Sequence, residues 1–267
     1  MGNRGSEENG TSQMKTLVTA IQKGGQGKTF ATCHLAFDFH ERGLRVAVAD
    51  LDTQGNASYT LEGHESGYPA SQLFGGDAAA LRAHFTGRED DGLVVIEADA
   101  ALANIEGNMK AGEAAARLRA NIEALGEFFD VLLIDTPPSL GVIMTAAVVA
   151  SDYMLSPLEM EAYSLHGIKK MVAVIGNLRK QNPKLRFLGM VPNKVDARKP
   201  RHVGNLADVR EAYPQLVTPF SIGSRDSIAE ALGEQVPVWK IKKTAARAAA
   251  KEVRALAQYV FDKMEIA

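Results

Sequence analysis

The segment Lys23–Thr29, which reads KGGQGKT, has the residue types and spacing of a phosphate-binding loop. Its glycines lack a Cβ atom, so the backbone can turn its N–H groups toward a bound anion. The Lys28 ammonium can reach terminal phosphates, and the Thr29 hydroxyl can bind Mg²⁺. We therefore expect this segment to bind a nucleoside triphosphate, with contacts from Lys23, Gly24, Gly25, Gln26, Gly27, Lys28, Thr29 and Phe30.

Three aspartates follow apolar runs and are candidates for metal binding and water activation. Asp50 and Asp52 come after the apolar run 44–49, and Asp135 ends the run 131–134. Carboxylates at the carboxyl ends of parallel strands, next to a phosphate loop, typically hold Mg²⁺ or the attacking water. An ordinary Asp-Gly turn remains the alternative for the first pair.

Later polar and basic residues suggest contacts with a base and with a polyanion. Asn193 follows the apolar run 188–191 and could meet a purine base, although a structural turn is the alternative. Between residues 240 and 254 there are six cationic residues and one acid, and Lys242 and Lys243 are among them. This stretch is either a solvated helix face or a surface for nucleic acid or anionic membrane.

Strand-like and helix-like segments alternate along the chain, and the phosphate loop follows the first strand. Helical patterns are expected at 30–40, 101–125, 162–181, 224–232 and 244–264, and residues 61–92 predict loops and short helices. The pattern predicts an α/β fold of the P-loop NTPase type, a mostly parallel twisted sheet with helices on both faces.

Composition narrows the range of function classes. The 267 residues carry a formal net charge of -2, so binding to nucleic acid would depend on a local patch. No long apolar run or signal peptide is visible, and Cys33 is the single cysteine, which fits a reducing cytoplasm. We expect a disordered tail over 1–13 and one ATPase domain over 14–267.

Three blocks at 22–29, 50–58 and 131–140, with later matches at 193–198 and 225–231, resemble the ParA/MinD-type ATPases. The additional lysine, Lys23, gives the deviant form of the loop that is specific to this family. The sequence is most similar to the sequences of plasmid partition ParA proteins of the IncC type, from IncP plasmids. The chain shows no long N-terminal helix-turn-helix extension, so autorepression through site-specific DNA binding is not expected.

The resemblance implies a homodimer that encloses two ATP molecules, hydrolyses them slowly to ADP and binds double-stranded DNA without sequence preference. Lys23 would cross to the partner's nucleotide, Asp52 would position the attacking water, and Lys28 would complete the catalytic set. Thr29, Asp50 and Asp135 would hold Mg²⁺. DNA contacts would come from Arg198 and Arg225, with Lys242 and Lys243, and a ParB-like protein would stimulate release in the cytoplasm, at the nucleoid.

Three positions differ from the family pattern. Gln26 replaces the usual valine and is expected to place a polar side chain at the dimer seam. Phe30 replaces a second threonine, and Thr53 replaces a proline.

Other function classes remain possible from the sequence. A MinD-like membrane-positioning ATPase would use the last helix as an anchor, but its alanine-rich face offers little area to lipid, so no stable membrane insertion is expected. Electron transfer through an iron–sulfur cluster would need more cysteines than Cys33. A scaffold that does not hydrolyse ATP is a further alternative.

Overall fold

The computed structural model describes residues 13–88, 91–160 and 165–266. All but the last residue of the predicted tail 1–13 lie outside this part of the chain. Within it, six strands form one sheet in the order β3-β2-β4-β1-β5-β6, and every pairing is parallel. The strands are β1 (Lys15–Thr19), β2 (Val46–Asp50), β3 (Leu93–Ile96), β4 (Val131–Asp135), β5 (Tyr153–Glu159) and β6 (Arg186–Asn193).

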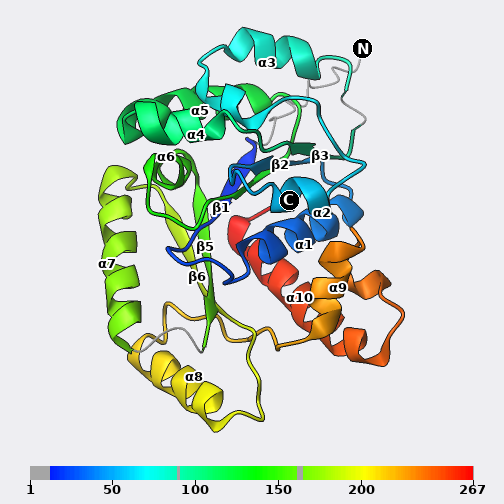
Figure 1. The fold of residues 1–267 in the computed structure, drawn as a ribbon, viewed down its shortest axis with the longest axis vertical. Coiled ribbons are helices and arrows are strands. Elements are labelled where there is room, and N and C mark those ends of the chain that lie inside the picture. Colours follow the sequence, from blue (N-terminus) through cyan, green and yellow to red (C-terminus); the bar gives the residue numbers. More distant parts are fainter. Residues whose placement is uncertain (1–12, 89–90, 161–164, 267) are drawn as a thin grey trace, which may run out of the picture.

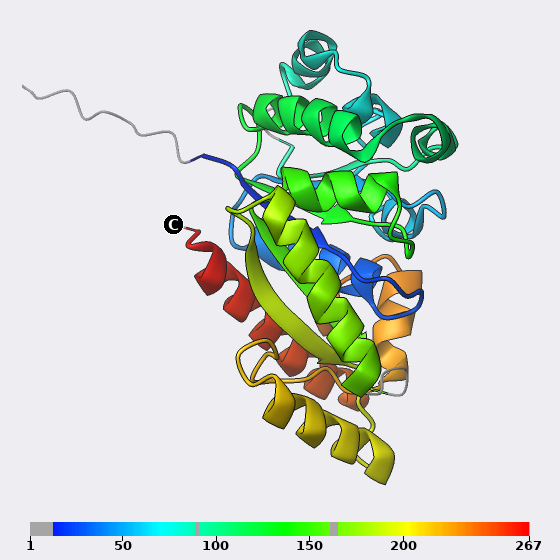
Figure 2. The ribbon, with the colours of Figure 1, turned by 90° about the vertical axis from the view of Figure 1, so that its left-hand side faces the viewer.

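Helices cover both faces of this sheet (Figures 1 and 2). One face packs against α1 (Lys28–Glu41), α2 (Asn56–Thr60), α9 (Asp226–Gly233) and α10 (Thr244–Met264). The other face packs against α3 (Ala78–Phe85), α5 (Ala111–Leu125), α6 (Val142–Ala150) and α7 (Leu165–Gln181). Alternate residues of β1 enter the two cores, Leu17 on the first side and Val18 on the second. The predicted α/β architecture is confirmed.

The remaining helical segments lie around these layers. The 3₁₀ turn η1 (Ala70–Phe74) and α4 (Leu102–Asn108) contact each other beside α5 and α6. A second 3₁₀ turn, η2 (Val238–Lys240), connects to α10, and α8 (Pro200–Ala212) lies beyond β6 (Figure 1).

Three helices, α2, α6 and α8, were not predicted, and one predicted helix is divided. Helix α6 is an almost uniformly apolar segment, so it carries no helical period in its sequence. Helix α8 begins at Pro200, two residues after Arg198, which was predicted only as a DNA contact. The helix expected over 101–125 is interrupted because Met109 and Lys110 have extended backbone angles, so α4 and α5 are separate.

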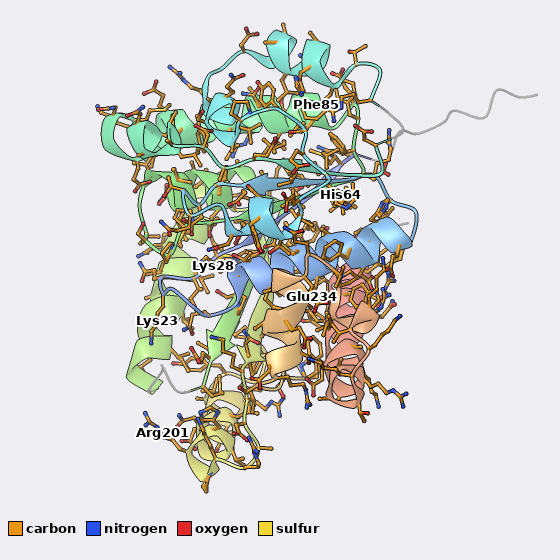
Figure 3. All side chains as sticks on the ribbon, turned by 45° about the vertical axis from the view of Figure 1, so that its right-hand side comes forward. Lys23, Lys28, His64, Phe85, Arg201 and Glu234 are labelled. Carbon is orange, nitrogen blue, oxygen red and sulfur yellow. The ribbon has the colours of Figure 1, made fainter. Side chains whose placement is uncertain are left out.

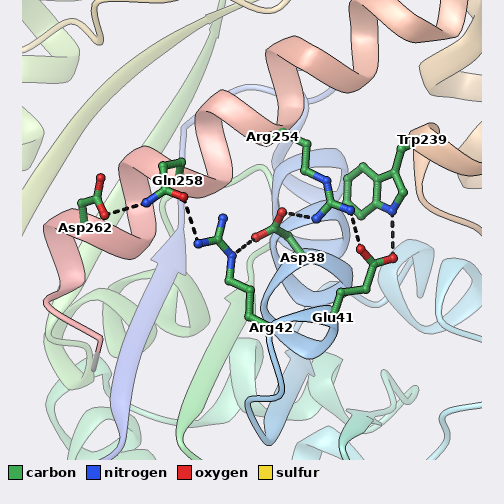
Figure 4. Close-up of polar contacts among 7 residues, drawn as sticks. All are labelled: Asp38, Glu41, Arg42, Trp239, Arg254, Gln258 and Asp262. Carbon is green, nitrogen blue, oxygen red and sulfur yellow. Dashed lines mark hydrogen bonds and ion pairs between the residues drawn. The ribbon is translucent and has the colours of Figure 1, made fainter.

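Helix α1 is the most enclosed helix of the first face, with eleven buried residues. Its far end is tied to α10 by a charged network (Figure 4). Asp38 is fully buried and accepts from Arg254 and from Arg42, whose Nε lies 2.5 Å from its carboxylate. Arg254 also pairs with Glu41 and lies 3.6 Å from the centroid of the Trp239 ring. Because Asp38 has no access to water, these cations replace its solvation.

We predict that Arg254→Ala lowers the free energy of unfolding by about 2 kcal/mol, since breaking a buried ion pair is costly but Arg42 remains beside Asp38. Chemical denaturation checks this. Arg82→Ala is the matched control, because Arg82 and Glu127 form an ion pair with side chains 44% and 52% exposed. Such a pair should contribute less than about 1 kcal/mol. Equal losses in the two variants would contradict the structural role of the network.

Candidate functional site

The phosphate loop and the predicted aspartates meet at one edge of the sheet, the edge formed by the carboxyl ends of the strands. Asp135 on β4 stands in register with Thr19 on β1 and with Asp50 on β2. The loop 20–27 joins β1 to α1 above these ends. In front of it lies a cavity of about 760 Å³, which the loop, Asp52, Asn193 and residues of α2 and α9 line.

Two features of the loop fix its shape. Gly27 has φ +100°, and a Cβ atom there would lie 2.2 Å from the Asn193 side-chain nitrogen, so only glycine fits. Lys28 follows as the first residue of α1 and is buried, with burial lowering the pKa of its ammonium from the ordinary value. Lys23 is exposed on the outer part of the loop, whereas Lys28 lies at the start of α1 (Figure 3).

A hydroxyl and two buried carboxyl groups lie behind Lys28. The Thr29 hydroxyl donates to Asp135 Oδ2 at 2.5 Å. Asp50 accepts from the Ser58 backbone at 2.8 Å and from the Ser58 hydroxyl at 2.9 Å. Burial, with the nearby Asp50 charge, raises the pKa of Asp135 to about 7, and burial also raises the pKa of Asp50.

This arrangement fits a bound Mg²⁺. Within the described part of the chain, Asp135 Oδ1 is a buried oxygen without a hydrogen-bond partner. A buried oxygen acceptor left without a donor is costly, and hard divalent cations prefer carboxylate and hydroxyl oxygens. Thr29 and Asp135, with Asp50 beside them, form a donor set of this kind.

Asp52 lies at the mouth of the site rather than in the core. Its side chain is half-buried, lines the cavity and accepts from the Gln54 backbone at 3.1 Å. At the end of β4, the Thr136 hydroxyl donates to the Thr19 carbonyl at 2.8 Å and so joins the ends of β4 and β1. An aspartate in this place has access to solvent in the cavity.

The structure shows contacts within the protein for three residues that were predicted to bind the nucleotide: Gln26, Asn193 and Phe30. The Gln26 side chain, expected at the dimer seam, is 1% exposed and bonds to Glu159 of its own chain. Asn193 donates to the Gln26 carbonyl at 2.7 Å. Phe30 is buried, packs on His34 with ring centroids 4.9 Å apart, and is among the residues that line the cavity.

The predicted DNA contacts do not gather into one group of unpaired cations. Arg225 pairs with Glu252 at 2.5 Å, and Lys243 pairs with Glu230 at 2.5 Å. Arg198, with its side chain 89% exposed, pairs with Asp196 at 2.9 Å. Lys242 is exposed in the segment before α10. Arg225 is the residue of this group that lines the nucleotide-sized cavity.

Two residues at the site were missed from the sequence, Glu159 and Lys194. Glu159 is the last residue of β5 and bonds to Gln26, and Lys194 donates to the Gly25 carbonyl at 2.7 Å. Glu159 ends β5 and Lys194 follows β6, so their position at the carboxyl edge of the sheet was a usable signal.

Comparison with known proteins identifies the family. The model of the AAA domain family matches residues 14–187, which is more than half of the chain. Protein IncC from Escherichia coli is 75% identical over 267 residues, which cover 100% of this chain and 74% of that protein. The chain belongs to the ParA/MinD-type ATPases.

A more distant relative and a solved structure are also similar to this chain. Chromosome partitioning protein ParA from Caulobacter vibrioides (strain NA1000 / CB15N) is 32% identical over 90% of this ParA-type chain and 93% of its own. Cobyrinic acid a,c-diamide synthase from Mycobacterium smegmatis, with an ATP analog and magnesium bound, superposes with a TM-score of 0.75. It is 27% identical, and the match covers 94% of this chain and 96% of that one.

The family is one of P-loop ATPases that hydrolyse ATP, and this chain is a ParA-type partition ATPase. The MinD-like alternative is not favoured. In the described residues no helix is long and apolar enough to cross a membrane. The apolar residues of α10, including Val253, Leu256 and Val260, are buried against the core, where lipid could not reach them.

We predict that Asp135→Asn stabilises the nucleotide-free protein near pH 8. An acid whose pKa rises from 3.8 to about 7 on folding favours the folded state at low pH, and that benefit is lost as the pH rises through this range. The neutral amide avoids the loss, so at about 1.4 kcal/mol per pKa unit the gain should be roughly 2–4 kcal/mol.

Thermal unfolding of both proteins between about pH 5 and pH 8 measures this difference. The advantage of Asp135→Asn should shrink toward the acidic end. A variant that is less stable than the parent at every pH would show that Asp135 is ionised and compensated in the nucleotide-free protein.

Proposed function

We propose that this chain is the nucleotide-dependent switch of a DNA partition system. In its ATP form it dimerises and binds double-stranded DNA without sequence preference, and hydrolysis, stimulated by a ParB-like protein, releases it. The observation that carries this proposal is the phosphate loop with an exposed Lys23 and a buried Lys28, facing the Thr29–Asp135 pair.

For the nucleotide, the loop amides and Lys28 bind the phosphates of ATP, and the Thr29 hydroxyl and the Asp135 and Asp50 carboxylates hold Mg²⁺. The cation, when bound, neutralises charge on the phosphate oxygens. Solved structures of the cobyrinic acid synthase with ATP analog or with ADP, each with magnesium, support this assignment. Asn193 and the α9 side of the cavity are the candidates for contact with the base.

For hydrolysis, Asp52 orients the attacking water. Its carboxylate lines the cavity beside the loop and keeps contact with solvent, unlike the enclosed Asp50. Lys23 acts on the nucleotide of the partner subunit, where a cation stabilises charge that develops on the transferred phosphoryl group.

For DNA, the basic residues Arg198, Arg225, Lys242 and Lys243 contact phosphates. Three of them, Arg198, Arg225 and Lys243, form ion pairs with carboxylates of the same chain. DNA phosphates must therefore replace those carboxylates. Arg225 lines the cavity and lies on the segment before α9. This segment therefore connects the nucleotide site with the proposed DNA-binding surface. This activity would place the protein at the nucleoid.

We predict that DNA affinity requires ATP and falls steeply with salt, because each phosphate contact adds about 0.9 to the logarithmic salt slope. A titration with ATP, ADP and no nucleotide checks this. Arg225→Ala should weaken binding about tenfold while the dimer persists, and Lys242→Ala somewhat less. Arg82→Ala, on α3 of the other face, is the control and should bind DNA as the parent does. Equal affinity in all three nucleotide states would exclude the switch.

We predict that the two lysines of the loop have different roles: Lys28 is needed for ATP binding, and Lys23 is needed for ATP-dependent dimerisation. Lys28→Ala should lose ATP affinity by more than about tenfold, because a buried charged contact to phosphate disappears. Lys23→Ala should retain ATP binding by the monomer but lose the ATP-dependent dimer and most hydrolysis. Calorimetry and light scattering on the same samples distinguish the two. Normal dimerisation of Lys23→Ala would refute a role across the subunit boundary.

A further inference from the structure

The Gln26 side chain makes a two-point contact with Glu159, the last residue of β5. Gln26 Oε1 accepts from the Glu159 backbone N–H at 2.9 Å. Gln26 Nε2 donates to Glu159 Oε2 at 3.1 Å. With 1% exposure, Gln26 is a buried polar group with its amide oxygen and nitrogen both bonded. The phosphate loop is therefore bonded to the end of β5. In the sheet, β5 lies on one side of β1 and β4 lies on the other.

The same loop is held by two more side chains through its carbonyl groups. Asn193 Nδ2 donates to the Gln26 carbonyl at 2.7 Å, and Lys194 Nζ donates to the Gly25 carbonyl at 2.7 Å. Lys194 has φ +52°, a conformation unusual for a residue with a Cβ, and its ammonium also lies 3.9 Å from Glu159 Oε1. The ends of β5 and β6 thus contact two successive residues of the loop, Gly25 and Gln26.

The consequence for phosphate binding follows from peptide geometry. The described chain has no cis peptide bond, so each N–H points away from the carbonyl of the preceding residue. Fixing the Gly25 carbonyl orients the Gln26 N–H, and fixing the Gln26 carbonyl orients the Gly27 N–H. Since a loop that binds phosphate must present its N–H groups together, these contacts place the amides before the ligand arrives.

We propose that Gln26 and Glu159, called here the Gln26–Glu159 pair, are positioning residues that hold the loop in its phosphate-binding shape. The pair sets the affinity for ATP and leaves the chemical step to other groups. This inference rests on ATP binding by the chain and is independent of DNA binding. It also gives a role to the polar residue that replaces the valine typical of the family.

The chemistry of the pair permits a swap experiment. Gln26→Glu sets two carboxylates about 3 Å apart, where they repel and distort the loop. Glu159→Gln keeps an acceptor for the Gln26 amide but removes the charge beside Lys194. The double variant Gln26→Glu with Glu159→Gln reverses donor and acceptor and restores the bond, while the backbone N–H of residue 159 can still donate.

The measurement is Mg-ATP affinity by calorimetry, together with kcat and KM for hydrolysis. Near pH 8 we expect Gln26→Glu to raise the Kd and KM about tenfold with little change in kcat. The loss should diminish toward pH 6, where one carboxyl group of the two takes up a proton. Among the described residues, Lys194 adds a positive charge beside the pair, with its ammonium 3.9 Å from Glu159 Oε1. The double variant should recover most of the parent's affinity.

The chain offers a matched control on α10, where Gln258 Nε2 donates to Asp262 Oδ1 at 2.7 Å (Figure 4). Gln258→Glu creates the same kind of carboxylate contact far from the loop and should leave ATP affinity unchanged.

Two results would overturn the proposal. One is a folded Gln26→Glu that binds ATP as the parent does near pH 8, and the other is a folded double variant no better than the single one. If Gln26→Glu does not fold, the comparison of Gln26→Val with the double variant decides, since only the double variant should retain affinity. Failure of the parent itself to bind Mg-ATP would instead refute the proposed function.

Discussion

A carboxyl group enclosed in the sheet is the constraint on which this site depends. Asp135 ends β4 between β1 and β2 and is 1% exposed, next to the equally buried Asp50. Two acids in a region of low polarity are unfavourable when both are charged. The Thr29 hydroxyl and the Lys28 ammonium compensate for part of that cost, and both come from the first turn of α1. The loop, the start of α1 and the ends of β2 and β4 therefore meet around these two acids.

Helix α1 transmits this constraint to the rest of the first face. Midway along it, His34 bonds to the Phe30 carbonyl at 3.0 Å and accepts from the Val238 N–H at 3.1 Å. Burial lowers the pKa of His34 to about 4, so the ring stays neutral and can accept this bond. At its far end the Asp38 and Glu41 carboxylates hold α10 through Arg254. The helix that begins at the phosphate site is thus fixed at its start, middle and end.

Much of the fold could be read from the sequence because local patterns encode it. The apolar run 131–134, ended by Asp135, coincides with β4, and the aspartates at the ends of β2 and β4 marked the edge that carries the site. Helix α6 was not predicted because a buried apolar segment has no polar face, so its sequence shows no helical period.

The contacts among Gln26, Glu159 and Asn193 could not be predicted because they join residues 133 and 167 positions apart. Whether a side chain at position 26 points outward or inward depends on what stands at the end of β5. Sequence similarity to a family gives the backbone of the loop but not this choice. Where a residue type departs from the family pattern, tertiary contacts determine the direction in which its side chain points.

The burial of Cys33 inside α1 has a practical consequence for labelling. It is the single cysteine of the chain, it is 0% exposed, and burial raises the pKa of its thiol, so reagents that need an accessible thiolate cannot react with it in the folded protein. A cysteine introduced on the surface would then be the sole reactive thiol, without removal of the native one. Fluorophores or spin labels could be attached in this way to the wild-type background.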